Sequence, residues 1–201
     1  MRRVYASSFL VLLVATSACR SRAASAAGPV SSAGGAPAVS STPSFHVDAS
    51  VREVMDSVVA PSAQGLWDSV GRISDARGTV DLAPKSDADW AAVRRHAVAL
   101  VESTNLLLIP GRHVAPSGAA TSKADDADPG AELAPAEIER RVNGNWALWT
   151  GMANGLHDTA ANMLAAIDRK DVAGLERTGG DLDGVCESCH VTFWYPPNGG
   201  K

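Results

Sequence analysis

The chain has 201 residues, of which 18 are basic and 22 are acidic, giving a formal net charge of −4 at pH 7. Nucleic acid binds surfaces rich in lysine and arginine, so this charge balance argues against a nucleic-acid partner. The part from Phe45 onward is long enough for one domain with one hydrophobic core.

The first 19 residues predict a signal peptide. Arg2 and Arg3 precede an apolar run at 9–15 and then small residues, which is the layout of a secretory signal and is too short to span a bilayer. The sequence Thr-Ser-Ala-Cys at 16–19 also resembles a bacterial lipobox, in which Cys19 becomes the acylated first residue of the mature chain. We therefore expect export to the periplasm, with Cys19 as a lipid anchor to the membrane.

An ordinary signal peptide is the alternative to this lipoprotein signal. Lipoboxes usually carry leucine where Thr16 stands, and cleavage near Ala23 or Ala24 would discard Cys19. Residues 20–44 consist almost wholly of Ala, Ser, Gly, Pro and Val, a composition that cannot bury a core and predicts a flexible tether. A tether of this kind favours the anchored form.

Helical periodicity dominates residues 45–201, which we interpret as one domain. Apolar residues recur at helical spacing from Val47 to Val59, and the pattern resumes after Pro61 and runs to Ile73. Pro61 should kink or split this first helix, because proline has no N–H group to donate.

A second helix should begin at Ser86 or Asp87, either of which can cap it, and should stop before Pro110. Residues 111–134 are rich in Gly, Ala, Asp, Ser and Pro and have no apolar period. They predict a long connection between elements.

A third helix is predicted over 135–167 as one long element, because its apolar stripe runs through Gly144 and Gly155 despite their low helix propensity. A last helix should begin near Asp171 and end before Pro196. With no strand pattern, four amphipathic helices predict an all-α fold, an antiparallel four-helix bundle.

The C-x-x-C-H sequence formed by Cys186, Cys189 and His190 is typical of covalent haem attachment. On a helix, positions i and i+3 share a face, so both thiols can reach the two vinyl groups along one edge of a porphyrin. His190 follows near that face and can offer an imidazole nitrogen to the iron as the proximal ligand. The pattern predicts one covalent haem c.

Other uses of the cysteine pair fit less well. A structural zinc site needs about four ligands, and Cys19 is the only other cysteine. A thioredoxin-type site needs its first thiol at the N-terminus of a helix, whereas Cys186 lies near the end of a helical pattern. A disulfide between Cys186 and Cys189 would leave His190 without a role.

A C-x-x-C-H signature in the last helix of a four-helix bundle resembles cytochrome c′ and its low-spin, methionine-ligated relatives. The resemblance covers residues 48–195. Family members commonly carry an aromatic and then a basic residue after the histidine; here Phe193 matches the aromatic one, whereas Trp194 replaces the basic one. This departure suggests a divergent branch, and the family also raises a homodimer as an oligomeric state for the chain.

The resemblance implies that Met55 is the distal iron ligand, because a methionine of the first helix fills that position in the low-spin relatives. Met55 lies on the apolar stripe of the first predicted helix. The alternative is that Met55 only fills a gap in the core. His157 is the next candidate. Of the other histidines, His46 lies before the first helix, His96 lies on a face predicted to be solvated, and His113 lies in a loop.

The distal ligand separates two functions. With His190 and Met55 both bound, the iron has no open site, and the chain would carry single electrons rather than act as an enzyme. If Met55 is only packing, the distal pocket would admit nitric oxide or carbon monoxide, as in a gas-binding sensor or scavenger. A haem-free helical scaffold is the third interpretation.

Charge indicates the kind of redox partner. Arg2 and Arg3 are the only charged residues before Cys19, so 16 basic residues face 22 acidic ones from there onward, for a formal charge of −6. A surface of this sign favours a partner with a basic patch.

Overall fold

The computed structural model describes residues 45–119 and 132–196. The predicted signal peptide, Cys19 and the tether at 20–44 lie outside these ranges, as does part of the predicted connection at 111–134. The described chain is mostly helical and includes one two-stranded antiparallel sheet. None of its helices combines the length and hydrophobicity that a membrane span requires.

The first predicted helix is a continuous helical stretch of three segments, which are α1 at Val51–Val54, a π-helix (η1) at Met55–Val59 and α2 at Ala60–Trp67. The N–H of Ala60 donates to the carbonyl of Met55, five residues back, which is the wider π-helical pattern. Pro61 follows directly, and its missing N–H and its ring both disturb α-helical bonding. The helix therefore changes type beside Pro61 and does not split there.

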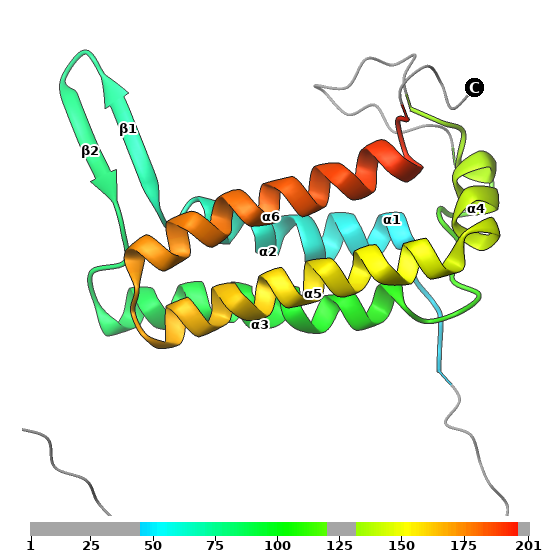
Figure 1. Ribbon diagram of the computed structural model, residues 1–201, viewed down its shortest axis with the longest axis horizontal. Coiled ribbons are helices and arrows are strands. Elements are labelled where there is room, and N and C mark those ends of the chain that lie inside the picture. Colours follow the sequence, from blue (N-terminus) through cyan, green and yellow to red (C-terminus); the bar gives the residue numbers. More distant parts are fainter. Residues whose placement is uncertain (1–44, 120–131, 197–201) are drawn as a thin grey trace, which may run out of the picture. The chain divides into compact units, whose positions relative to one another are not determined.

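A β-hairpin follows this stretch, so the expectation of a fold without strands was wrong, whereas the expected helical character is confirmed. Strand β1 at Gly71–Asp75 pairs antiparallel with β2 at Gly78–Leu82, and Ile73 lies opposite Val80. Gly71 and Gly78 have φ angles of +141° and +130°, which favour glycine. Figure 1 shows the hairpin projecting away from the helices, and Ile73 lies in it rather than on the first helix.

Helix α3 spans Asp87–Leu107 and helix α6 spans Val172–Phe193. The predicted starts of both helices are confirmed. Ser86, rather than Asp87, caps α3 by accepting from the N–H of Asp89, and Asp171 caps α6 by accepting from the N–H of Gly174.

The third predicted helix consists of two elements, α4 at Pro135–Gly144 and α5 at Trp146–Asp168, so the prediction of one long helix was wrong. Asn145 separates them with φ −138° and ψ +53°, outside the helical region. Glycine has low helix propensity, and asparagine can bond its own backbone in place of the helix, so both residues favour a break here.

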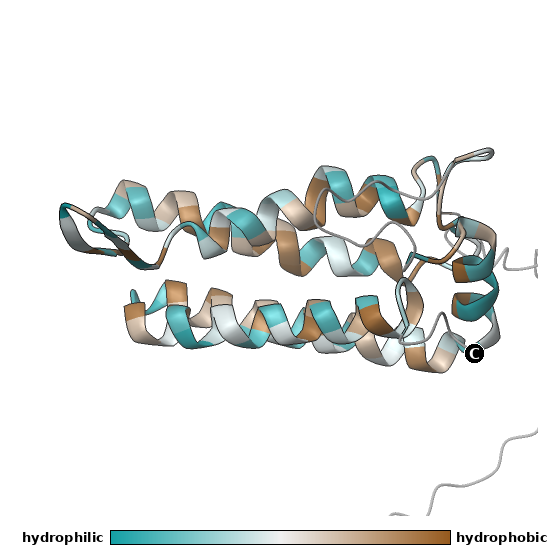
Figure 2. Ribbon diagram, turned by 90° about the horizontal axis from the view of Figure 1, so that it is seen from above, coloured by the Kyte–Doolittle hydropathy of each residue, from teal (hydrophilic) through white to brown (hydrophobic). Residues whose placement is uncertain are grey.

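The helices pack in a closed order. Helix α3 contacts α2 on one side and α5 on the other, α5 contacts α6, and α6 returns to α2, while α4 contacts α5 and α6. The colours of Figure 2 alternate between hydrophobic and hydrophilic along the helices, as expected when each helix buries one face. The largest fully buried side chains include Trp149, Phe193, Leu66, Leu100, Ile138, Met163, Leu175 and Leu182.

Candidate functional site

The cysteine signature lies in the last turns of α6, on the stripe that faces the core. Leu175, Gly179 and Leu182 are buried on this stripe. Cys186 and Cys189 continue it at helical spacing and pack against the core, but both are only half-buried. The core-facing side chains of α6 are therefore less buried at Cys186 and Cys189 than before them.

The first helical stretch shows a similar change. Val54 and Val59 are 4% exposed, whereas Met55 and Val58 between them are half-buried. The backbone of α6 comes close to α2 but comes close to α1 and η1 at few positions or none. Two partly covered apolar surfaces thus lie on the first stretch and on the end of α6.

Specific contacts tie the start of α1 to the end of α6. Arg52 of α1 forms an ion pair with Glu132 at 3.0 Å, and the two side chains are 15% and 8% exposed. The N–H of Leu133, the next residue, donates to the carbonyl of Trp194 at 2.8 Å. The two helix ends therefore meet at one end of the molecule, as Figure 1 also shows.

Met55 lies at the level of the signature. The first stretch and α6 run in opposite directions, and the indole N–H of Trp67 donates to the carbonyl of Gly179 at 3.0 Å. Met55 lies twelve residues before Trp67, and Val191, the neighbour of His190, lies twelve residues after Gly179. At a rise of about 1.5 Å per residue, Met55 and Val191 each lie about 18 Å along their helices from the Trp67–Gly179 hydrogen bond. Because the helices are antiparallel, both residues lie on the same side of that bond and at a similar level.

His190 lies among aromatic rings at this end. Its ring centroid is 6.1 Å from that of Trp194 and 5.9 Å from that of Tyr195. Burial lowers the pKa of His190 below its ordinary value of 6.5, against an opposing effect from Glu187. The imidazole is therefore neutral at neutral pH, which is the form that can bind a metal through a ring nitrogen.

Trp149 of α5 supports the end of α6 from the core side. Its ring meets Phe193 edge-on at 5.3 Å and stacks with Trp194 at 6.2 Å. Its indole N–H donates to the carbonyl of Leu107, at the end of α3, at 2.8 Å. These contacts fix the last turn of α6, which carries His190, against α3 and α5.

Cys186 and Cys189 are free thiols. Burial is the main cause that raises the pKa of each to about 11, with smaller effects of Asp183 on Cys186 and of Cys186 on Cys189. Both thiols are therefore protonated at neutral pH. A thioredoxin-type site needs a lowered thiol pKa, so the structure goes against that alternative.

Within the described ranges, no group of three or more His, Cys, Asp or Glu side chains is arranged to hold a metal ion. A structural zinc site would need such a group. Haem iron does not, because the porphyrin supplies four of its ligands and the protein supplies only the axial ones.

The other candidate ligands lie in different environments. The His157 side chain is 42% exposed, and its Nδ1 lies 3.2 Å from Asp158 Oδ1. His113 pairs with Glu139 at the surface. His96 is not on a solvated face, because a Cβ added at Gly65 would lie only 2.6 Å from its ring.

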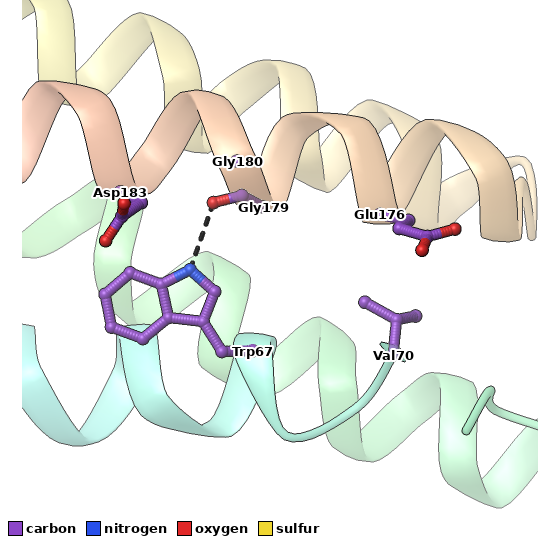
Figure 3. Close-up of a pocket in the computed structure, with 6 residues that line it drawn as sticks. All are labelled: Trp67, Val70, Glu176, Gly179, Gly180 and Asp183. Carbon is purple, nitrogen blue, oxygen red and sulfur yellow. Dashed lines mark hydrogen bonds between the residues drawn. The ribbon is translucent and has the colours of Figure 1, made fainter. Parts of the chain in front are cut away.

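Two features of this region were missed in the sequence. Tyr195 donates its O–H to Glu187 at 3.2 Å across the last turns of α6. A groove of about 320 Å³ also lies between α2 and α6, and its lining includes Gly179 and Gly180 (Figure 3). Two consecutive glycines inside a helical pattern were the signal for a close approach or an open space there.

The structure therefore brings two thiols, a neutral imidazole and a thioether to one end of the helices, where the apolar cover is incomplete. Thiols can form thioether bonds, and imidazole and thioether groups can bind iron. Comparisons of the chain with protein-family models, curated proteins and solved structures found no match.

Proposed function

We propose that the chain is a c-type cytochrome that binds one covalent haem c and carries single electrons. The first helical stretch, α3, α5 and α6 would form a four-helix bundle like that of cytochrome c′. The observation that carries the proposal is the C-x-x-C-H signature on the half-covered end of α6, at the level of the half-covered Met55. A flat, mostly apolar group could cover the partly exposed apolar surfaces of the first helical stretch and of the end of α6, which lie at a similar level.

The residues present fit such a group. Cys186 and Cys189 would hold the haem through thioether bonds, since both thiols lie on the inward stripe of α6. His190 would bind one side of the iron as a neutral imidazole, held by the rings of Trp194 and Tyr195. Haem supplies an iron centre that changes between two oxidation states, and ligand identity and burial set its potential.

Met55 would bind the other side of the iron through its thioether. Its position at the start of η1, beside buried valines, would give it an apolar surrounding that keeps water away. With His190 and Met55 both holding the iron, the bound group would supply electron exchange without an open position for a substrate. Gas binding is the competing function, and it would follow if Met55 stays off the iron.

The first experiment is expression of the full chain together with a haem-attachment system. We expect the intact mass of the purified protein to include one haem and the pyridine haemochrome spectrum to show two thioether bonds. Cys186→Ala and Cys189→Ala should each shift that spectrum toward one remaining vinyl group, and the double variant should lose covalent haem. Ser188→Ala, a change between the cysteines at an exposed position, is the matched control.

Absence of covalent haem from the wild-type protein, in cells that attach haem to another C-x-x-C-H protein, would contradict the proposal. It would favour a haem-free helical scaffold.

A further inference from the structure

The groove between α2 and α6 has an apolar floor and an acidic rim. Trp67 at the end of α2 and Val70 in the turn after it form one side, and Gly179 with the exposed Gly180 leaves the facing side of α6 open. Figure 3 shows Asp183 beside the six-membered ring of Trp67 and Glu176 above Val70. The volume of about 320 Å³ is at the small end of ligand sites and suits a single side chain.

The rim carboxylates are available for a cation. Glu176 and Asp183 are both exposed and form no ion pair with another described side chain. Arg72 lies near enough to Glu176 to interact electrostatically, but its guanidinium bonds to Asp81 at 2.6 Å. The groove thus presents two carboxylates beside an indole ring, and neither carboxylate is in an ion pair with another described side chain.

A long basic side chain matches this combination. Lysine and arginine carry an apolar stem that can lie on Trp67 and Val70, and a positive head that carboxylates and the face of an indole ring attract. A small anion would be repelled by the rim, and a purely apolar group would leave the carboxylates without a partner.

We infer that the α2–α6 groove is the docking site for a basic partner protein, which inserts a lysine or arginine side chain between Glu176 and Asp183. The groove lies one helical turn before Cys186, the first predicted attachment residue. A partner docked there would lie beside the haem edge. Its role as the electron-exchange partner rests on the proposed function, whereas the binding of a basic side chain does not.

The test uses the full chain as purified, with ¹⁵N label, and two blocked peptides. One peptide carries two lysines spaced by two glycines, and the other has norleucine in place of each lysine. We expect the lysine peptide to shift the indole N–H resonance of Trp67 in a saturable way, and the norleucine peptide to leave it in place. Added salt should weaken the binding of the lysine peptide.

Charge-neutralising variants test the rim. Glu176→Gln and Asp183→Asn should each weaken binding of the lysine peptide by about two- to fivefold, the size expected for an exposed ion pair. Asp181→Asn makes the same charge change on the opposite side of α6, and it should leave the affinity nearly unchanged. Arg72→Gln removes a positive charge near Glu176 and should strengthen binding.

Equal shifts with both peptides, or equal weakening by Asp181→Asn and Asp183→Asn, would overturn the inference. So would binding that leaves the Trp67 resonance in place. Haem content is measured separately on the same sample. A chain that lacks haem but binds the lysine peptide at Trp67 would therefore support the groove while contradicting the cytochrome.

Discussion

Under the proposed function, Met55 would decide between electron transfer and gas binding. We expect the haem-loaded wild type to be low-spin, and Met55→Leu to convert it to a high-spin form that binds carbon monoxide rapidly when reduced. Leucine nearly keeps the volume of methionine, so the free energy of unfolding should fall by less than about 1.5 kcal/mol. Visible spectra with and without carbon monoxide measure the first effect, and denaturant unfolding measures the second.

Met152→Leu is the matched control, because Met152 is also half-buried but lies on α5. Its spectrum should remain that of the wild type. A high-spin wild type that already binds carbon monoxide would instead favour the gas-binding function. A low-spin Met55→Leu protein would mean that another residue binds the iron, and His157 would be tested next.

Residues that act through local spacing could be predicted, and those that depend on folding could not. Cys186, Cys189 and His190 lie within five residues, so their grouping depends only on a helix. Met55 lies on the predicted apolar stripe, but its position level with His190 follows from contacts between distant segments. Tyr195 lies beyond the observed end of α6 at Phe193, and its bond to Glu187 depends on how the chain leaves α6.

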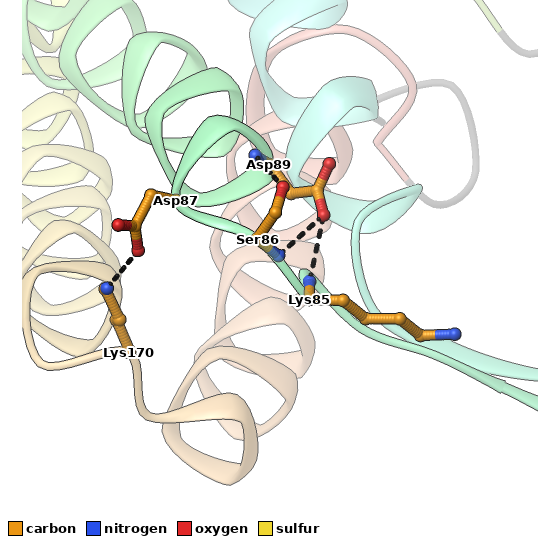
Figure 4. A network of polar contacts seen from close by, with 5 residues as sticks. All are labelled: Lys85, Ser86, Asp87, Asp89 and Lys170. Carbon is orange, nitrogen blue, oxygen red and sulfur yellow. Dashed lines mark hydrogen bonds and ion pairs between the residues drawn. The ribbon is translucent and has the colours of Figure 1, made fainter.

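At the scale of single elements, the start of α3 depends on the network in Figure 4. Ser86 accepts from the N–H of Asp89, and Asp89 accepts from the N–H of Ser86 in return. Ser86→Ala should lower the free energy of unfolding by about 1 kcal/mol, because one N–H of the first turn loses its partner. Thr192→Ala is a control near the end of α6. The Thr192 hydroxyl donates to the carbonyl of Ser188, which is a helical carbonyl, so its loss leaves no backbone N–H without a partner. A smaller loss for Ser86→Ala than for Thr192→Ala would contradict this role.

The same network predicts a response to acid. Backbone N–H groups of Ser86 and Lys85 hold the pKa of Asp89 below its ordinary 3.8, and Lys170, at 2.5 Å, does the same for Asp87. The ionised carboxylates are favoured in the folded state, so their contribution is present at neutral pH. It is lost as the pH falls below about 4 and through the lowered pKa values.

Urea unfolding of the haem-free chain between about pH 6 and pH 3 measures this contribution. The variant with both Asp87→Asn and Asp89→Asn should lose less stability over this interval than the wild type. Asp158→Asn, at an exposed position on α5, is the control. Identical pH dependence in the wild type and the double variant would argue against the contribution.

Helices were predicted correctly where the helical spacing of apolar residues matched a single helix. The predictions were wrong where that spacing continued past the end of a helix into the next element. Leu66, Val70 and Ile73 are spaced as on a helix, which hid the hairpin that begins at Gly71. The strands bury little, so no strict apolar alternation marked them, although Gly71 and Gly78 bounded a short run. The stripe also stays in phase across Asn145, so periodicity alone could not show the break between α4 and α5.

At the scale of the whole molecule, we propose that Cys19 anchors the chain to the membrane. If Cys19 is acylated, the protein should fractionate with the membrane, and Cys19→Ser should move it to the soluble periplasm. One acyl chain anchors weakly, so stable retention would need the further acylation that a bacterial lipoprotein signal provides. Cell fractionation and the N-terminal residue of the mature chain measure the outcome. An N-terminus near Ala24 together with unchanged fractionation would show an ordinary secreted protein.

The helical segments of the chain could largely be located from the sequence, because each carries an apolar stripe, although one stripe spans both α4 and α5. The axial position of one helix relative to its neighbour could not be predicted. It depends on pairs such as Trp67 with Gly179 and Arg52 with Glu132, which lie far apart in the sequence. The groove between α2 and α6 exists only once that axial position is fixed.

The π-helical turn at Met55–Val59 gives the first helix an unusual tolerance of length. A turn closed by a bond across five residues holds about one residue more than an α-helical turn. Deleting one residue there can restore the tighter turn while the stretches on either side keep their facing. The same deletion in the middle of α3 would rotate every later side chain by about 100° and move apolar groups out of the core. A one-residue deletion should therefore be accepted in the segment next to Met55 and rejected in the middle of α3.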